Sequence, residues 1–173
     1  MPRRNSPLAV SLTAALAAAA VTPALAGPEL VSYPKDKGAL YGTVERADNK
    51  QVRELYAPKA AVDAVKAGKP VPDGTSITML LYKAKLDDKG APALDAGGRF
   101  QKGDPIAHFV MQKSKGWGTG YGADMRNGEW EYRAFTPEGK PNEKADLKPC
   151  FTCHKPKADQ DYVFSLSRMK GAK

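Results

Sequence analysis

The sequence predicts an α+β fold made mainly of antiparallel β-strands, with a few short helices. Stretches in which apolar and polar residues alternate recur along the chain, separated by turn residues, as in strands with one buried face. The 14 prolines and 16 glycines are scattered through these stretches, and both residue types disfavour the interior of long helices. Only one segment has the spacing of an amphipathic helix.

Alternation identifies five expected strands. They comprise residues 40–46, 51–56, 76–83, 105–112 and 129–136. Successive side chains of a strand point to opposite faces, so Ile77, Met79 and Leu81 share one face of the third strand. In the fourth strand, Phe109 and Met111 share a face, and His108 points to the other.

One short helix is expected at residues 58–67, between the second and third strands. It has a proline in its first turn and an apolar stripe formed by Ala61, Val62 and Val65. Gly68 follows as a stop signal.

The remaining segments lack a clear strand or helix pattern. Residues 86–104 are rich in Gly, Asp and Ala and are predicted to form a loop long enough to act as a lid. The Gly-rich stretch 116–128 lacks the features of a phosphate-binding loop, so its glycines are expected to permit bends and close backbone approach. Residues 137–148 form a polar linker, and 162–169 are expected to end the chain as a strand or short helix.

The N-terminus has the pattern of a secretory signal peptide. Two arginines precede an apolar run from Leu8 to Val21, and an Ala-Leu-Ala cleavage pattern ends at Ala26. The run is too short and too often interrupted for a membrane span. We therefore expect residues 1–26 to be a signal peptide and 27–173 to form a single domain in the periplasm; removing 26 of 173 residues leaves 147.

The chain is basic, with a formal charge of +8 that falls to +6 without the two arginines of the signal peptide. Its lysines are spread among acidic residues rather than gathered in a dense block. This pattern favours a solvated basic surface that would steer an acidic redox partner, and no nucleic-acid partner is expected.

The segment "KPCFTCHKP" (148–156) contains both cysteines of the protein. C-x-x-C-H is the attachment signature of c-type haem: Cys150 and Cys153 are expected to form thioether bonds to the porphyrin, and His154 to bind the iron. A thioredoxin-like dithiol would need a strand–motif–helix arrangement early in a βαβ unit. A zinc site would need about four ligands, and a simple disulfide leaves the adjacent histidine unexplained. One covalent haem c, attached near the C-terminus, is therefore the expected cofactor.

The chain resembles the cytochrome P-460 and cytochrome c′-beta family over most of its expected mature length. The resemblance lies in "LYAPKAAVDAVKAGKPVPDGTSITMLLY" (55–82), "GDPIAHFV" (103–110), "WEYRAF" (130–135) and "CFTCHKPKADQDYVF" (150–164). It implies an exported haem protein with an antiparallel sheet, a possible homodimer, and an open or weakly filled iron position opposite the histidine.

The resemblance also implies which branch of the family is closer. In hydroxylamine-oxidising members, a lysine four residues beyond the Thr of Asp-Gly-Thr is crosslinked to the porphyrin; this chain has Met79 there. An ungapped match places Phe109 where those members have an acidic group above the iron. Both differences favour the non-crosslinked branch, whose members bind nitric oxide or other small gases.

Several roles stay open at this stage. Met79 is also compatible with core packing, or with ligation of the iron by its sulfur, which would raise the reduction potential. Phe109 is also compatible with ordinary core packing, and His108 is a rival sixth ligand. Met111 and Met125 are weaker ligand candidates. The candidate partners for the haem propionates are Arg53, Arg126 and Arg168.

Three functions follow from these expectations. The first is a gas-binding cytochrome with a His proximal ligand and an apolar distal pocket. The second is an electron carrier with a methionine as sixth ligand. The third is an oxidoreductase that acts on hydroxylamine or a related nitrogen compound without the crosslink, so whether the protein is an enzyme stays open.

Overall fold

A computed structural model describes residues 30–172 of the chain. The expected signal peptide, residues 1–26, lies outside the described residues. Five strands form one antiparallel sheet in which each strand pairs with the next along the chain. The strands are β1 (Ala39–Arg46), β2 (Gln51–Ala57), β3 (Ser76–Ala84), β4 (Lys102–Lys113) and β5 (Trp130–Phe135). The α+β prediction is confirmed.

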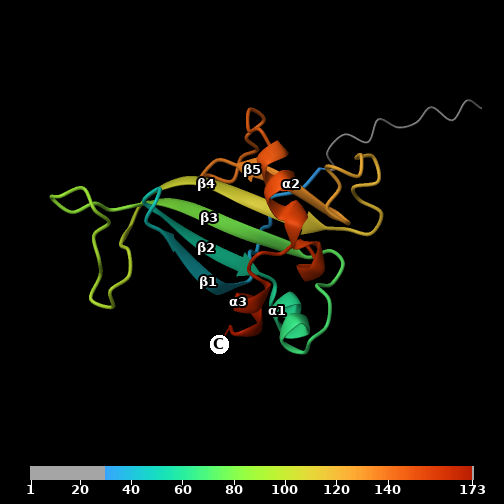
Figure 1. The fold of residues 1–173 in the computed structure, drawn as a ribbon, viewed down its shortest axis with the longest axis horizontal. Coiled ribbons are helices and arrows are strands. Elements are labelled where there is room, and N and C mark those ends of the chain that lie inside the picture. The colour runs from blue at the N-terminus through green and yellow to red at the C-terminus, as the bar shows by residue number, and fades with distance from the viewer. Residues whose placement is uncertain (1–29, 173) are drawn as a thin grey trace, which may run out of the picture.

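Short helices gather around one end of this sheet, while a long arm projects from the other end (Figure 1). The helices are α1 (Lys59–Lys66), α2 (Lys148–His154), the 3-10 helix η1 (Lys155–Gln160) and α3 (Leu166–Lys170). In the part of the chain that the structure describes, no helix is long and apolar enough to cross a membrane.

The predicted elements are close to the observed ones. Helix α1 lies within the expected segment 58–67, and Ala61, Val62 and Val65 are its buried residues. The last apolar segment, left open between strand and helix, contains most of α3. Strand β4 begins at Lys102, earlier than expected, because its pairing with β3 continues past a register shift near Tyr82.

The two faces of the sheet carry different side chains. We call inner face the one that contains the cross-strand row Leu55, Met79, Phe109 and Ala134, whose members are paired directly in register. The outer face contains Glu54, Leu80, His108 and Phe135, which form the adjacent row. The larger hydrophobic cluster combines inner-face residues with Phe151, Val163 and Met169 from the C-terminal segment.

A smaller cluster covers part of the outer face. Val31, Val110 and Phe135 are buried together there, with Tyr33 packed against them. The segment before β1 therefore packs on the outer face, and the C-terminal helices pack on the inner face.

The segment 86–104 is more regular than expected. It contains two similar Asp-Gly turns: Asp87 Oδ1 accepts hydrogen bonds from two backbone N–H groups at 2.9 Å, and Asp95 Oδ1 does the same eight residues later. Isolated bridges join Leu86 to Pro92 and Leu94 to Phe100. These turns build the arm, residues 85–101, that leaves the sheet away from the helices (Figure 1).

Candidate functional site

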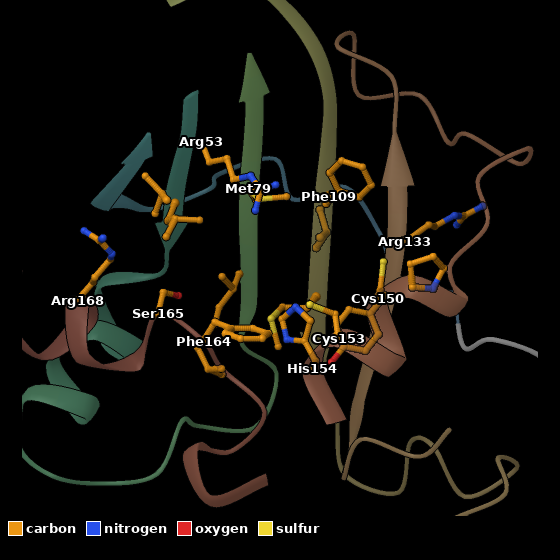
Figure 2. A pocket seen from close by; sticks show the side chains of 18 of the residues that line it. Arg53, Met79, Phe109, Arg133, Cys150, Cys153, His154, Phe164, Ser165 and Arg168 are labelled. Carbon is orange, nitrogen blue, oxygen red and sulfur yellow. The ribbon is translucent and has the colours of Figure 1, made fainter. Parts of the chain in front are cut away.

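A cavity of about 580 Å³ lies between the inner face and the C-terminal segment. This volume is within the range of about 300–1,000 Å³ that is usual for cofactor pockets. The sheet supplies a mostly apolar side that includes Val44, Leu55, Met79, Phe109 and Met111. Helix α2 and the segment leading into α3 supply the opposite side (Figure 2).

All five site residues expected from the sequence line this one cavity. Cys150, Cys153 and His154 come from α2, and Met79 and Phe109 come from β3 and β4. Met79 and Phe109 are direct cross-strand partners, so they lie side by side. Figure 2 shows this pair on the sheet side, across the cavity from His154.

Helix α2 carries the two cysteines three residues apart, about one turn of the helix from each other. Pro149 stands in its first turn, where its missing N–H breaks no helical hydrogen bond. Both cysteines are free thiols; Cys150 is half-buried and Cys153 is exposed. Burial, and secondarily the neighbouring Cys153, raise the pKa of Cys150, so Cys150 remains a thiol at neutral pH.

A hydrogen bond to the backbone orients the ring of His154. Its Nδ1 lies 2.7 Å from the carbonyl oxygen of Tyr162. Since a carbonyl only accepts, Nδ1 carries the proton, and Nε2 keeps its lone pair free for a metal. Burial lowers the pKa of His154, although the bond to Tyr162 acts in the opposite direction. A neutral imidazole is the form that binds metals.

Aromatic rings hold the imidazole from two sides. The ring of Tyr132 lies 5.0 Å from that of His154, and the ring of Phe164 lies 5.1 Å away in an edge-on arrangement. Tyr132 also packs edge-on against Phe151 inside α2. The sequence placed Tyr132 on a strand but gave no signal of this contact, which depends on how α2 docks.

His108 is not in the cavity. It lies on the outer face, where its Nδ1 is 2.8 Å from the hydroxyl of Tyr33 and the two rings stack at 5.5 Å. The hypothesis that His108 is a sixth ligand is therefore wrong, and the alternative of a hydrogen-bonded sheet histidine describes it. Met111 lines the cavity and Met125 does not.

Arginines line one part of the cavity. Arg46, Arg53 and Arg168 are among its lining residues, and the Nε of Arg53 is buried without a hydrogen-bond partner. Burial lowers the pKa of Arg53. Arg126, another expected propionate partner, points elsewhere and donates its Nε–H to the carbonyl of Gly128 at 3.2 Å.

These features fit a haem. The cavity is apolar, as a porphyrin requires, and offers two thiols beside an imidazole nitrogen that is free to bind iron. The orphaned guanidinium nitrogen of Arg53 suits a carboxylate such as a propionate. Within residues 30–172, no group of three or more His, Cys, Asp or Glu side chains is arranged for a metal ion alone.

The arm does not cover the cavity. None of the described residues 86–104 lines it, and the arm leaves the sheet at the end away from helix α2 (Figure 1). The prediction of a lid is therefore wrong. Its physical reason is the direction of β3 and β4, whose connection lies at the sheet end far from α2.

The Gly-rich stretch 116–128 contacts helix α2, which carries the C-x-x-C-H motif, and holds it in place. Asn127, fully buried, donates from Nδ2 to the Phe151 carbonyl and to the Tyr132 hydroxyl, both at 3.0 Å. Lys155 donates from Nζ to the carbonyls of Ala123 and Arg126. Sequence reasoning missed both residues: Asn127 lies outside any recognisable motif, and Lys155, although it directly follows the haem motif, has no assigned role in it.

Comparison with models of protein families identifies a match over most of the described chain. The family model described as Cytochrome P460 matches residues 33–165. This range includes all five strands, α2 and η1. A search of curated protein sequences finds no match to the chain.

Proposed function

Because the chain belongs to the cytochrome P460 family, a family of haem proteins, we propose that it is an exported monohaem c-type cytochrome that binds nitric oxide or another small gas. The observation that carries this proposal is the free Nε2 of His154, beside two thiols on one edge of an apolar cavity. Bound haem supplies an iron that coordinates small diatomic ligands.

Five residues of the chain are proposed to hold the haem. Cys150 and Cys153 form thioether bonds, His154 is the proximal ligand, and Arg53 and Arg168 pair with the propionates. This assignment is supported by their common cavity. The arginines are retained because they line that cavity, whereas Arg126 does not.

On the sheet side, Met79 and Phe109 form an apolar distal wall. With Arg53 paired to a propionate, a distal wall that presents only these apolar side chains to the ligand favours nitric oxide or carbon monoxide over oxygen, since bound oxygen carries partial negative charge that a donor would stabilise. A thioether at position 79 offers no amine for a crosslink, which supports the non-crosslinked branch. The cavity lining contains no Asp or Glu among the described residues, so the hydroxylamine-oxidising alternative receives no support from a carboxylate base.

The test is a mass and spectral analysis of protein matured in a host that attaches c-type haem. We expect an intact mass that includes one haem, and a high-spin ferrous spectrum that shifts when nitric oxide is added. The Cys150→Ser, Cys153→Ser double variant should lose the covalent haem. Bare wild-type polypeptide, or a ferrous spectrum unchanged by nitric oxide, would contradict the proposal.

The electron-carrier alternative is favoured by one observation, the place of Met79 across the cavity from His154 (Figure 2). If its sulfur binds the iron, the ferrous spectrum is low-spin, and Met79→Leu converts it to high-spin. Met111→Leu is the matched control, since Met111 also lines the cavity. Under the gas-binding proposal, both variants keep the high-spin spectrum of the wild type.

The place of action and the partners belong to the same proposal. Export through residues 1–26 would put the protein in the periplasm, where its basic surface would meet an acidic redox partner. We also propose that a homodimer forms, as the resemblance implies. Light scattering of the haem-loaded protein checks the dimer, and N-terminal sequencing of the mature chain checks cleavage after Ala26.

A further inference from the structure

The carbonyl that orients His154 stands in an unusual turn. Asp161 and Tyr162 have φ values of 51° and 59°, the left-handed conformation that non-glycine residues adopt only at a cost. Besides these two, only Lys50 among the described non-glycine residues has a positive φ. Surrounding contacts must therefore hold two consecutive residues in this conformation.

The carboxylate of Asp161 makes those contacts with the sheet. Its Oδ2 accepts a hydrogen bond from Lys113 Nζ at 2.8 Å, and its Oδ1 accepts one from Trp130 Nε1 at 3.3 Å. Lys113 is the last residue of β4 and Trp130 the first of β5, and the two are direct cross-strand partners. We call these two hydrogen bonds of Asp161, to Lys113 and Trp130, the Asp161 clamp. Because Trp130 is fully buried, the clamp is attached to a well-packed part of the sheet.

Two further contacts hold Tyr162 itself. Its backbone N–H donates to the carbonyl of Lys157 at 2.7 Å. Its ring lies against the backbone of Gly128, where an added Cβ would be only 2.9 Å from a ring carbon. The peptide that carries the Tyr162 carbonyl is thus fixed by β4, β5 and the Gly-rich stretch together.

We propose that Asp161 is a positioning residue for the proximal ligand. Its clamp on Lys113 and Trp130 holds the 161–162 turn, so that the Tyr162 carbonyl receives the Nδ1–H of His154. A hydrogen bond at the second nitrogen makes a ligand histidine more basic, and a more electron-donating axial ligand lowers the reduction potential. This inference rests on the proposed role of His154 as iron ligand.

The experiment compares variants of the haem-loaded protein. Asp161→Gly removes both acceptors and keeps easy access to positive φ, and Asp161→Asn removes the charge while tolerating this conformation. In both, we expect a raised reduction potential and a lower iron–histidine stretching frequency in the ferrous resonance Raman spectrum. The matched control is Asp159→Asn, an exposed acid in helix η1 two residues before Asp161, which should change neither readout.

Lys113→Met separates positioning from simple charge effects. Loss of a positive charge near the haem would by itself lower the potential, whereas loosening the clamp raises it and lowers the stretching frequency. We expect the latter, and an effect in the double variant Asp161→Asn, Lys113→Met that is smaller than the sum of the single ones.

Wild-type values of both readouts in the Asp161 variants would overturn the inference. If those variants do not fold, a lowered potential with an unchanged stretching frequency in Lys113→Met would overturn it instead. Failure of the wild type to carry haem, by contrast, would overturn the proposed function, and the intact mass reports this separately.

Discussion

At the scale of single residues, the two histidines of the described chain have opposite surroundings. His154 lines the cavity and contacts two aromatic rings, whereas His108 lies on the outer face against Tyr33. Burial lowers the pKa of both rings. Iron binding would remove His154 from titration, so His108 is the histidine through which pH would act on the stability of the haem-loaded protein.

We expect the free energy of unfolding to fall as pH decreases through about 6.5, the unfolded pKa of histidine. Burial and the nearby Lys37 lower the pKa of folded His108, whereas Glu138 opposes them. The unfolded chain therefore binds a proton that the folded one does not, and protonation favours unfolding. Denaturant titrations at about pH 8 and about pH 5.5 should show that the free energy of unfolding falls more between these two pH values for the wild type than for His108→Gln. An equal fall in both proteins would contradict this prediction.

Two glycines allow a matched test of backbone packing. Gly38 and Gly90 have φ values of 79° and 76°, but a Cβ on Gly38 would lie 2.2 Å from the Ala57 carbonyl oxygen, whereas one on Gly90 would meet open space. Gly90→Ala should lower the free energy of unfolding by about 1–2 kcal/mol, the usual cost of the left-handed conformation. Gly38→Ala should cost more, above about 3 kcal/mol. Similar losses in thermal or denaturant unfolding would show that the clash relaxes.

At the scale of elements, α2 depends on its neighbours for its position. Its seven residues are too few for a helix that is stable alone. Phe151 anchors it in the core against Tyr121 and Tyr132, and Asn127 bonds to its backbone. A second tie holds the segment that leads into α3, where the Tyr41 hydroxyl lies 2.7 Å from Ser165 Oγ.

Asn127→Ala should destabilise the fold around the motif helix. The change leaves the Phe151 carbonyl and the Tyr132 hydroxyl without their partner in a buried place, a loss of about 1–3 kcal/mol. We expect a lower denaturation midpoint and faster proteolysis within 116–128. Asn142→Ala is the control, because Asn142 is exposed and its side chain bonds only to the nearby Lys144 N–H. If Asn127→Ala and Asn142→Ala changed the denaturation midpoint equally, Asn127 would not be a stabilising contact of helix α2.

The strands could be predicted because their signals are local, and the five expected site residues line one cavity. The alternation of apolar residues predicts which face of its own strand Met79 and Phe109 each occupy. In the structure these two faces are the same side of the sheet, because Met79 and Phe109 are direct cross-strand partners. The turn at 161–162 could not be predicted, because neither residue is a glycine and the clamp joins positions far apart in sequence. The regular turns of the arm could not be predicted, because its two Asp-Gly turns have neither strand nor helix periodicity. The brace from Asn127 depends on how the Gly-rich stretch docks, which no local pattern specifies.

At the scale of the whole molecule, the arm leaves the sheet at the end away from helix α2 (Figure 1), whereas the cavity extends along the inner face from α2 to Arg46 and Arg53. The arm reaches back to the sheet through an ion pair between Arg99 and Glu45. Arg99 is exposed and Glu45 partly buried, and ion pairs near the surface typically contribute about 1 kcal/mol or less to stability. Since none of the described arm residues 85–101 lines the cavity, attachment of haem at α2 should not require the arm.

Replacing residues 85–101 by an Asn-Gly turn tests this independence. Ala84 and Lys102 are already paired across β3 and β4, and Asn-Gly favours the tight turn that joins such strands. We expect an unchanged ferrous spectrum and a change in the free energy of unfolding of about 1 kcal/mol or less. Loss of haem attachment in this variant would show that the arm takes part in maturation.

The serial pairing of the sheet has a consequence for the order of assembly. Each strand joins the one just before it, so the sheet can grow as successive hairpins while the chain is still emerging. Helices α2 and α3 come last, and until they dock the inner face is an open half-shell of apolar side chains. A porphyrin bound to this open face would contact the thiols of Cys150 and Cys153 only when α2 docks. Haem attachment would then be the final step of folding.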